Sequence, residues 1–210
     1  MPPTEDRIDR RGRHARKEGM RLRQQNSKTE IQTGSLLVAL PTLLDSNFRR
    51  SILFLSHHDP EEGSVGFILN RPQEVCLGDL TNTSEGSQEI PVYEGGPVEQ
   101  KSLIVARIHW HGDVEGVRFQ SLGEEDLPSS SESSSGHDEI RAFTGYAGWS
   151  GGQLERELVE KSWVILPPTA DLLLPVKTQE EGSARWRAIM KRLGPMYHLM
   201  AQAPDELGLN

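Results

Sequence analysis

Most of the chain alternates short apolar runs with polar turns. The run at 35–40 (SLLVAL) is continuously apolar and ends before a proline, a pattern typical of a strand buried on both faces. The runs at 50–56 and 64–69 flank a polar corner at 57–63, and this arrangement predicts a hairpin. Further strands are predicted at 90–93, 101–110, 117–119, 139–146 and 163–166.

Helical periodicity appears in two late segments. One helix is predicted from about Gly151 to Lys161, with Leu154 and Leu158 on one face. A longer final helix has Ser183 as its expected N-cap and ends at Gly194-Pro195. Its apolar positions, spaced i, i+3, i+4 and i+7, are Trp186, Ile189, Met190 and Leu193.

The order of these elements, with short strands first and helices late, predicts an α+β fold instead of regular βαβ alternation. A chain of 210 residues can build one substantial core, so we expect a single domain over residues 31–210. Two polar segments fall outside that core. Residues 1–30 lack hydrophobic periodicity and predict a disordered arm, and about 122–138 is a serine-rich segment that predicts a flexible loop.

Charge is distributed unevenly between the arm and the body. Residues 1–30 hold nine Lys/Arg against five Asp/Glu, a balance of +4. Because the whole chain carries a net charge of −8, the other 180 residues carry −12. Nonspecific nucleic-acid binding depends on neutralising phosphates with Lys and Arg. The acidic body is therefore a poor nucleic-acid surface, and weak binding by the basic arm is the alternative.

The chain contains neither a signal peptide's apolar stretch nor a run of the ~20 apolar residues that a membrane span needs. Its single cysteine, Cys76, cannot form an internal disulfide, which agrees with a reducing compartment. We therefore expect a cytoplasmic protein with no membrane contact.

The run Gly145-Tyr146-Ala147-Gly148-Trp149-Ser150-Gly151-Gly152-Gln153 is the most specialised stretch of the chain. Its four glycines predict a turn, and Ser150 with Gln153 predicts a capping box at the start of the following helix. The helix N-terminus also presents free N–H groups to an anion, but the phosphate-loop Lys is missing and acidic residues follow.

Two sets of residues allow a catalytic or metal interpretation beside a structural one. Gly148, Ser150 and Gly152 match the bare Gly-x-Ser-x-Gly pattern of a nucleophile elbow, which makes a hydrolase the alternative function. Only His198 follows the serine, so no full triad is evident. The pairs His57-His58 and His109/His111 lack a third metal ligand, and we expect no catalytic, cofactor or metal residues.

Four separated motifs together resemble the YqgE/AlgH family of bacterial proteins. They are Leu36 to Pro41 with Asp45 and 48–51, then 66–72 (GFILNRP), then 95–98 (GGPV), and finally 145–149 (GYAGW) with Gly152 to Glu155 and Glu157. The resemblance implies an α+β fold in which a bifurcated, mostly antiparallel sheet forms a pseudo-barrel flanked by helices. The family is largely uncharacterised, with a proposed role in transcriptional regulation, yet no helix-turn-helix is visible here.

We therefore expect a non-catalytic binding or regulatory protein that acts on an unknown macromolecular partner or small ligand. A distinctive set of Gly, Trp and Asn-Arg residues without a complete catalytic constellation motivates this hypothesis. The expected binding surface comprises Asn70, Arg71, Pro72, Gly95, Gly96, Pro97, Gly145, Tyr146, Gly148, Trp149, Gln153 and Glu155.

Overall fold

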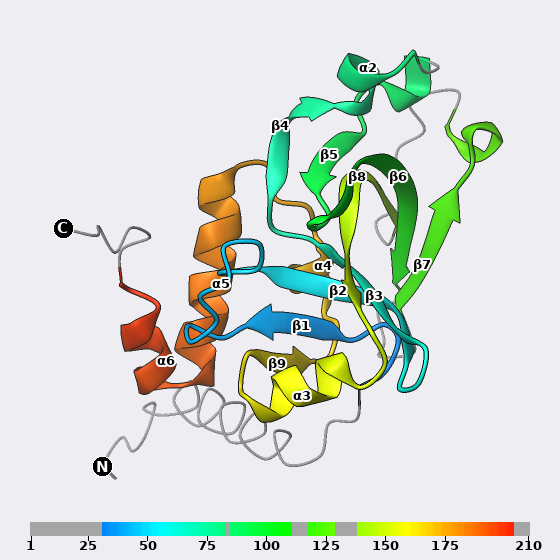
Figure 1. Ribbon diagram of the computed structural model, residues 1–210. Helices are drawn as coiled ribbons and strands as arrows, with labels where there is room; N and C mark the ends of the chain where they lie inside the picture. Colours follow the sequence, from blue (N-terminus) through cyan, green and yellow to red (C-terminus); the bar gives the residue numbers. More distant parts are fainter. Residues whose placement is uncertain (1–30, 83–84, 111–116, 129–137, 204–210) are drawn as a thin grey trace, which may run out of the picture.

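A strongly curled sheet of nine strands forms the body of the protein (Figure 1). The structure, a computed structural model, describes residues 31–82, 85–110, 117–128 and 138–203. The predicted arm, most of the serine-rich loop and His111 lie outside these residues. The strands are β1 Leu36–Ala39, β2 Ile52–Asp59, β3 Gly63–Ile68, β4 Pro72–Cys76, β5 Pro91–Glu94, β6 Val98–Trp110, β7 Val117–Leu122, β8 Asp138–Trp149 and β9 Trp163–Leu166.

Five α-helices and two 3₁₀ turns accompany the sheet in the described ranges. Most of the helical residues follow β8, as the sequence predicts, and α5 is the longest helix. In chain order these elements are α2 Leu77–Leu80, η1 Glu85–Ser87, η2 Glu124–Asp126, α3 Gln153–Val159, α4 Ala170–Leu173, α5 Gln179–Leu193 and α6 Pro195–Met200. None of the helices described is long and apolar enough to cross a membrane.

Strand β8 divides the sheet into two branches. Its first half pairs with β6 and, in parallel, with β5, whereas its last residues pair with β3. The main path runs β4-β5-β8-β3-β2-β1-β9, and β6 connects β8 to β7. Because every pairing except β5–β8 is antiparallel, the predicted bifurcated, mostly antiparallel α+β sheet is confirmed.

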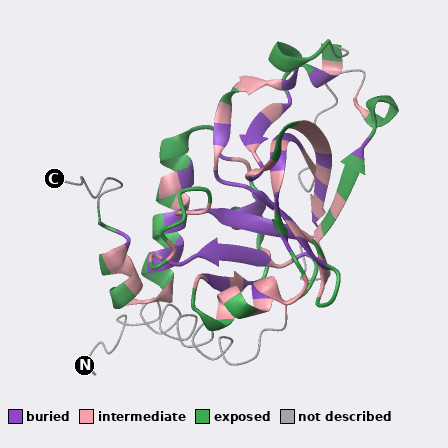
Figure 2. Ribbon diagram, in the orientation of Figure 1, coloured by how far each residue is buried: buried purple, intermediate pink, exposed green. Residues whose placement is uncertain are grey.

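The core lies on both sides of the central strands, of which β1 is buried throughout and β2 over its first four residues (Figure 2). Leu36 and Val38 of β1 pack in the larger cluster with Trp186 of α5, while Leu37 packs on the opposite face with Leu154 of α3. The continuous apolar run of β1 arises because helices cover both faces, as the sequence predicts. Trp186 satisfies its indole N–H by donating to the carbonyl of Ala39 at 2.7 Å.

Several predicted boundaries are wrong, each because a distant contact changes a local preference. The expected glycine turn is mostly strand, since β8 continues to Trp149 and only 150–152 form the turn. The expected polar corner at 57–63 is shorter, because β2 continues through Asp59 against β3. The carboxylate of Asp59 accepts the backbone N–H groups of Glu62 and Glu61, which lower its pKa.

Two predicted helix starts also change. Helix α3 begins at Gln153 after Gly152, which has a φ of 68°, so Ser150 is not its N-cap. Helix α5 begins four residues before Ser183, and the hydroxyl of Thr178 accepts the N–H of Glu181 at 3.1 Å. The predicted end of α5 at Gly194 is confirmed.

Candidate functional site

The two glycine motifs of the expected surface lie directly against each other. A Cβ on Gly95 would come within 2.2 Å of the Gly145 carbonyl oxygen, and one on Gly96 within 2.3 Å of the Tyr146 carbonyl carbon. Gly145 has a φ of 67°, and its own Cβ would meet the carbonyl oxygens of Val98 and Gly96 at 2.6 and 2.7 Å. These glycines allow the β5–β6 corner to cross β8 at backbone contact.

Trp149 is fixed by a carboxylate that serves three donors. Glu157 Oε2 accepts the indole N–H groups of Trp149 at 2.9 Å and Trp163 at 2.7 Å, while Oε1 accepts the Gln153 amide at 2.9 Å. Trp149 also stacks near Phe48, with ring centroids 6.1 Å apart. With only 5% of its surface exposed, Trp149 anchors α3 to the sheet.

The Asn70-Arg71 pair ties β3 to the loop before β2 and to α5. Asn70 accepts the N–H of Ile52 at 2.8 Å and donates to the carbonyl of Gly182 at 3.2 Å. Arg71 donates to Glu94 at 2.9 Å and to backbone carbonyls at Asn47 and Arg49. Both side chains therefore have internal partners.

The expected surface consequently includes few side chains that reach solvent. Asn70, Pro72, Gly95, Gly96, Gly145 and Trp149 are buried; Arg71, Pro97, Tyr146, Gln153 and Glu155 are half-buried; Gly148 is exposed. The structure brings the two glycine motifs together and places Asn70 at α5, away from Gln153 of α3. A binding role for this set stays a prediction.

Ser150 has a hydrogen-bond partner, but it is not a histidine. Its hydroxyl donates to Gln153 Oε1 at 3.1 Å, and the same oxygen accepts the Ser150 backbone N–H. His198 lies on α6, where its Nε2 contacts the Gln202 amide. Within the described ranges, no hydrogen bond joins Ser150 to His198.

A different serine and histidine do meet, at the β2–β3 hairpin. His58 Nδ1 shares a 2.8 Å hydrogen bond with the Ser64 hydroxyl, and His58 Nε2 lies 3.7 Å from Glu155 Oε1. Ser64 is only 4% exposed, so its oxygen is shielded from a substrate. The contact therefore fastens the hairpin to α3. No three His, Cys, Asp or Glu side chains gather as a metal site among the residues described.

A buried arginine lies on the core face of β8. Arg141 donates to the carbonyl of Leu173, and its guanidinium carbon lies 5.2 Å from the ring centre of Tyr93. Burial lowers the pKa of Arg141 and raises that of Tyr93, whose hydroxyl donates to Val176 at 2.7 Å. These contacts join α4 and the segment after it to the sheet.

A hollow lies beside β7. Its volume is about 650 Å³, within the ~300–1,000 Å³ range of ligand sites. Phe54 and Phe119, with ring centroids 5.8 Å apart, supply apolar surface. Arg107 and Arg118 supply positive charge. The remaining lining residues are Thr33, Ser56, His109, Val117, Gln120 and Asp138.

The β6–β7 ladder explains how these residues meet. Gln120 lies opposite Arg107 and Arg118 opposite His109, so these four share one face, whereas Phe119 lies opposite Ile108 on the other face. The hollow is lined from both faces, and it must therefore extend along the edge of β7. Asp138 joins the polar side by pairing with His109.

A family model described as AlgH-like matches residues 36–198, more than three-quarters of the chain. The chain belongs to the AlgH-like family. It is 34% identical to a UPF0301 protein of Chlorobium luteolum, over 88% of this chain and 98% of the relative. A UPF0301 protein of Streptomyces avermitilis is 36% identical, over 87% and 98% of the two chains.

Solved structures of similar proteins agree with the AlgH-like fold. The solution structure of the AlgH protein from Pseudomonas aeruginosa has a TM-score of 0.56 and 26% identity, covering 85% of this chain and all of that one. A crystal structure of a Corynebacterium diphtheriae protein has a TM-score of 0.59 at 21% identity, covering 84% and 95%. The resemblance to the family predicted from the motifs is confirmed.

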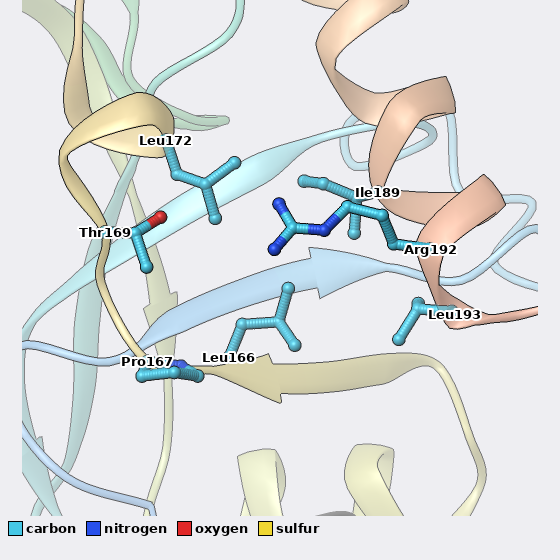
Figure 3. A pocket seen from close by; sticks show the side chains of 7 residues that line it. All are labelled: Leu166, Pro167, Thr169, Leu172, Ile189, Arg192 and Leu193. Carbon is cyan, nitrogen blue, oxygen red and sulfur yellow. The ribbon is translucent and has the colours of Figure 1, made fainter. Parts of the chain in front are cut away.

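Two smaller hollows of this AlgH-like chain are mainly apolar. One of them, with a volume of about 220 Å³, has the loop after β1 on one side and the side chains of Trp186 and Met200 on the other. The other, about 40 Å³, lies between β9, α4 and α5, where Leu172 and Ile189 face each other above Leu166 (Figure 3). Such a space holds a few water molecules at most, so the hollow beside β7 is the better candidate site.

The residues that line this hollow are not among the binding residues predicted from the sequence. Arg107 and His109 alternate with Ala106 and Ile108 along β6, which is the pattern of a strand with one polar face. That pattern is a detectable signal, but it does not reveal which polar side chains meet across strands. The pairing with β7 brings Arg118 to the same face.

Proposed function

We propose that this AlgH-like protein is a cytoplasmic binding protein of regulatory function, and that the hollow beside β7 is its binding site. The observation that carries the proposal is a hollow of about 650 Å³ that combines two guanidinium groups with two aromatic rings. Such a combination orients a ligand by charge and holds it by apolar contact. A direct part in transcription would follow from what the ligand or partner does.

The half-buried residues of the glycine motifs form the second part of the proposal. Tyr146 lies on β8, which pairs with β6, whereas Gln153 and Glu155 lie on α3, which contacts β3 and β9. In the proposed function they support β8 while β6 and β7 present the binding groups. The buried glycines and Trp149 set the geometry on which this arrangement depends.

Blocking the hollow without disturbing the fold tests the proposal. Gln120→Trp places a large side chain in the hollow, whereas Ser121→Trp places the same side chain on the other face of β7, at a position that does not line the hollow. Both positions are exposed, so both variants should fold. Binding would be measured by saturation-transfer NMR against a library of small molecules and short peptides.

We expect library members that bind the wild-type chain and the Ser121→Trp variant but not Gln120→Trp. Circular dichroism and thermal unfolding would confirm that all three proteins are equally folded. If no library member distinguishes Gln120→Trp from Ser121→Trp, the hollow is not the binding site and the proposal fails.

A further inference from the structure

Strand β7 has an edge beside the hollow with no second strand partner in the described ranges, although Gly34 approaches this strand at Val117. Within the described residues it pairs with β6 alone, and Figure 1 shows it at the outer margin of the sheet. Six residues at ~3.3 Å each give an edge of roughly 20 Å. Alternate residues of that edge direct their N–H and C=O groups away from β6, and these groups can pair with another extended chain.

The other two edge strands of the sheet, β4 and β9, are less suited to pair with an additional strand. Strand β9 has four residues, with Trp163 and Leu166 buried, and β4 begins with a proline, which has no N–H to donate. β7 contains no proline, and its sequence VRFQSL favours extended structure. It is therefore the margin best suited to accept a further strand.

Positive charge at Arg107 and Arg118 favours an acidic occupant beside the first part of β7, whereas the exposed acids Glu124, Glu125 and Asp126 follow the other end of the strand. Neither Arg107 nor Arg118 forms an ion pair within the described ranges, and Asp138 is already paired with His109. In the β6–β7 register Arg118 is the diagonal neighbour of Arg107, so both guanidiniums can approach one carboxylate-bearing chain. Arg107 and Arg118 therefore form a local positive site for acidic residues, although the body as a whole carries an acidic balance that opposes them.

We propose that the hollow binds an acidic, extended peptide from another protein, which adds to the sheet as a strand beside β7. This inference rests on the proposed binding function and names its ligand. Main-chain hydrogen bonds to β7 supply affinity, and side chains pointing to alternate faces supply specificity. Acidic side chains meet Arg107 and Arg118, while apolar ones lie against Phe54 and Phe119.

Two other occupants fit the charge less well. The basic residues 1–30 of this chain carry +4 and would be repelled by the two arginines. A second copy pairing β7 with β7 would bring Arg118 of each copy to the same edge, where like charges oppose association. An acidic peptide avoids both conflicts.

A selection experiment identifies the peptide chemistry directly. A phage library of random octapeptides would be selected on the full chain, with counter-selection on the Arg107→Gln/Arg118→Gln double variant. Enriched sequences should alternate Asp or Glu with apolar residues. A fluorescent synthetic copy would then be titrated against the wild-type chain, the double variant and Lys101→Gln, which removes an exposed cation of β6 outside the hollow.

We expect the double variant to weaken peptide binding by at least about tenfold, because two charge pairs are lost. Lys101→Gln should bind like the wild type. Two further peptides would carry N-methyl groups on the odd-numbered or on the even-numbered amides. One of the two should lose binding, because an added strand donates every second N–H group to β7, whereas attraction between charges does not need these groups.

The contrary outcomes separate this inference from the proposed function. Enriched peptides that are basic or uncharged, or that bind equally well when N-methylated in either register, would overturn strand addition by an acidic peptide. If only small molecules bind, and Gln120→Trp blocks them, the hollow remains the binding site but its ligand is not a peptide. If nothing binds there, both proposals fall.

Discussion

At the scale of single residues, Glu157 couples the family motif to the fold. It accepts hydrogen bonds from both Trp149 and Trp163, so Glu157→Ala leaves two largely buried indole N–H groups without a partner. Each unsatisfied buried donor costs about 1–3 kcal/mol. We expect the variant to lose at least about 2 kcal/mol of unfolding free energy, measured by urea unfolding with far-UV circular dichroism.

Glu160→Ala is the matched control for this prediction. Glu160 is exposed at the end of the same helix, so its removal should change the unfolding free energy by less than about 0.5 kcal/mol. Equal effects of the two substitutions would show that the carboxylate of Glu157 does not organise the tryptophans.

Glu139 gives the residue-scale prediction for pH. Partial burial raises its pKa above the usual 4.5, and the nearby Arg141 opposes this rise. The folded protein thus holds the Glu139 proton more tightly than the unfolded chain does. This difference contributes to the free energy of unfolding. The contribution is fully present below the pKa that Glu139 has in the unfolded chain, and it is lost as the pH rises through the pKa that Glu139 has in the folded protein.

Glu139→Gln removes this titration. The variant should gain stability relative to the wild type as the pH rises from about 4 to 7. Urea unfolding at several pH values measures the difference. Two stability curves that stay parallel across this range would contradict the assigned cause.

At the scale of elements, substitutions of Gly145 and Gly148 test whether a glycine of this motif is needed for close contact between backbones or only for backbone flexibility. Ala at Gly145 would adopt a positive φ and place its Cβ within 2.7 Å of two carbonyl oxygens. Ala at Gly148 would meet side chains alone, the Tyr146 ring at 3.4 Å and a Val98 methyl group at 3.9 Å. We expect Gly145→Ala to cost at least about 2 kcal/mol and Gly148→Ala less than about 1 kcal/mol, measured by thermal unfolding.

Comparable losses for the two substitutions would refute the role given to the β5–β6 crossing.

The same pair shows why the glycine turn was wrongly predicted from sequence. Glycine clusters are typical of turns because glycine permits unusual backbone angles. Here two of the four, Gly145 and Gly151, permit close approach of backbones, since Gly151 lies against the carbonyl of Glu61.

At the scale of the whole molecule, the opposite charges of arm and body make a separate prediction. Residues 1–30 are basic and the rest of the chain is acidic. Any nucleic-acid binding by the full chain should weaken steeply with salt and vanish when residues 1–30 are removed. Electrophoretic shifts of both chains at two salt concentrations would measure this, and retention by the truncated chain would assign binding to the body.

Local sequence signals determined the composition of the fold and its family. The apolar run of β1, the β2–β3 hairpin and the end of α5 at Gly194 were predictable because each depends on neighbouring residues. Only the tertiary structure decided that β8 continues past Tyr146 to Trp149, that Glu157 holds two tryptophans, and that Arg107 and Arg118 share a hollow. These features join segments far apart in the chain, and a single sequence carries no direct record of such contacts.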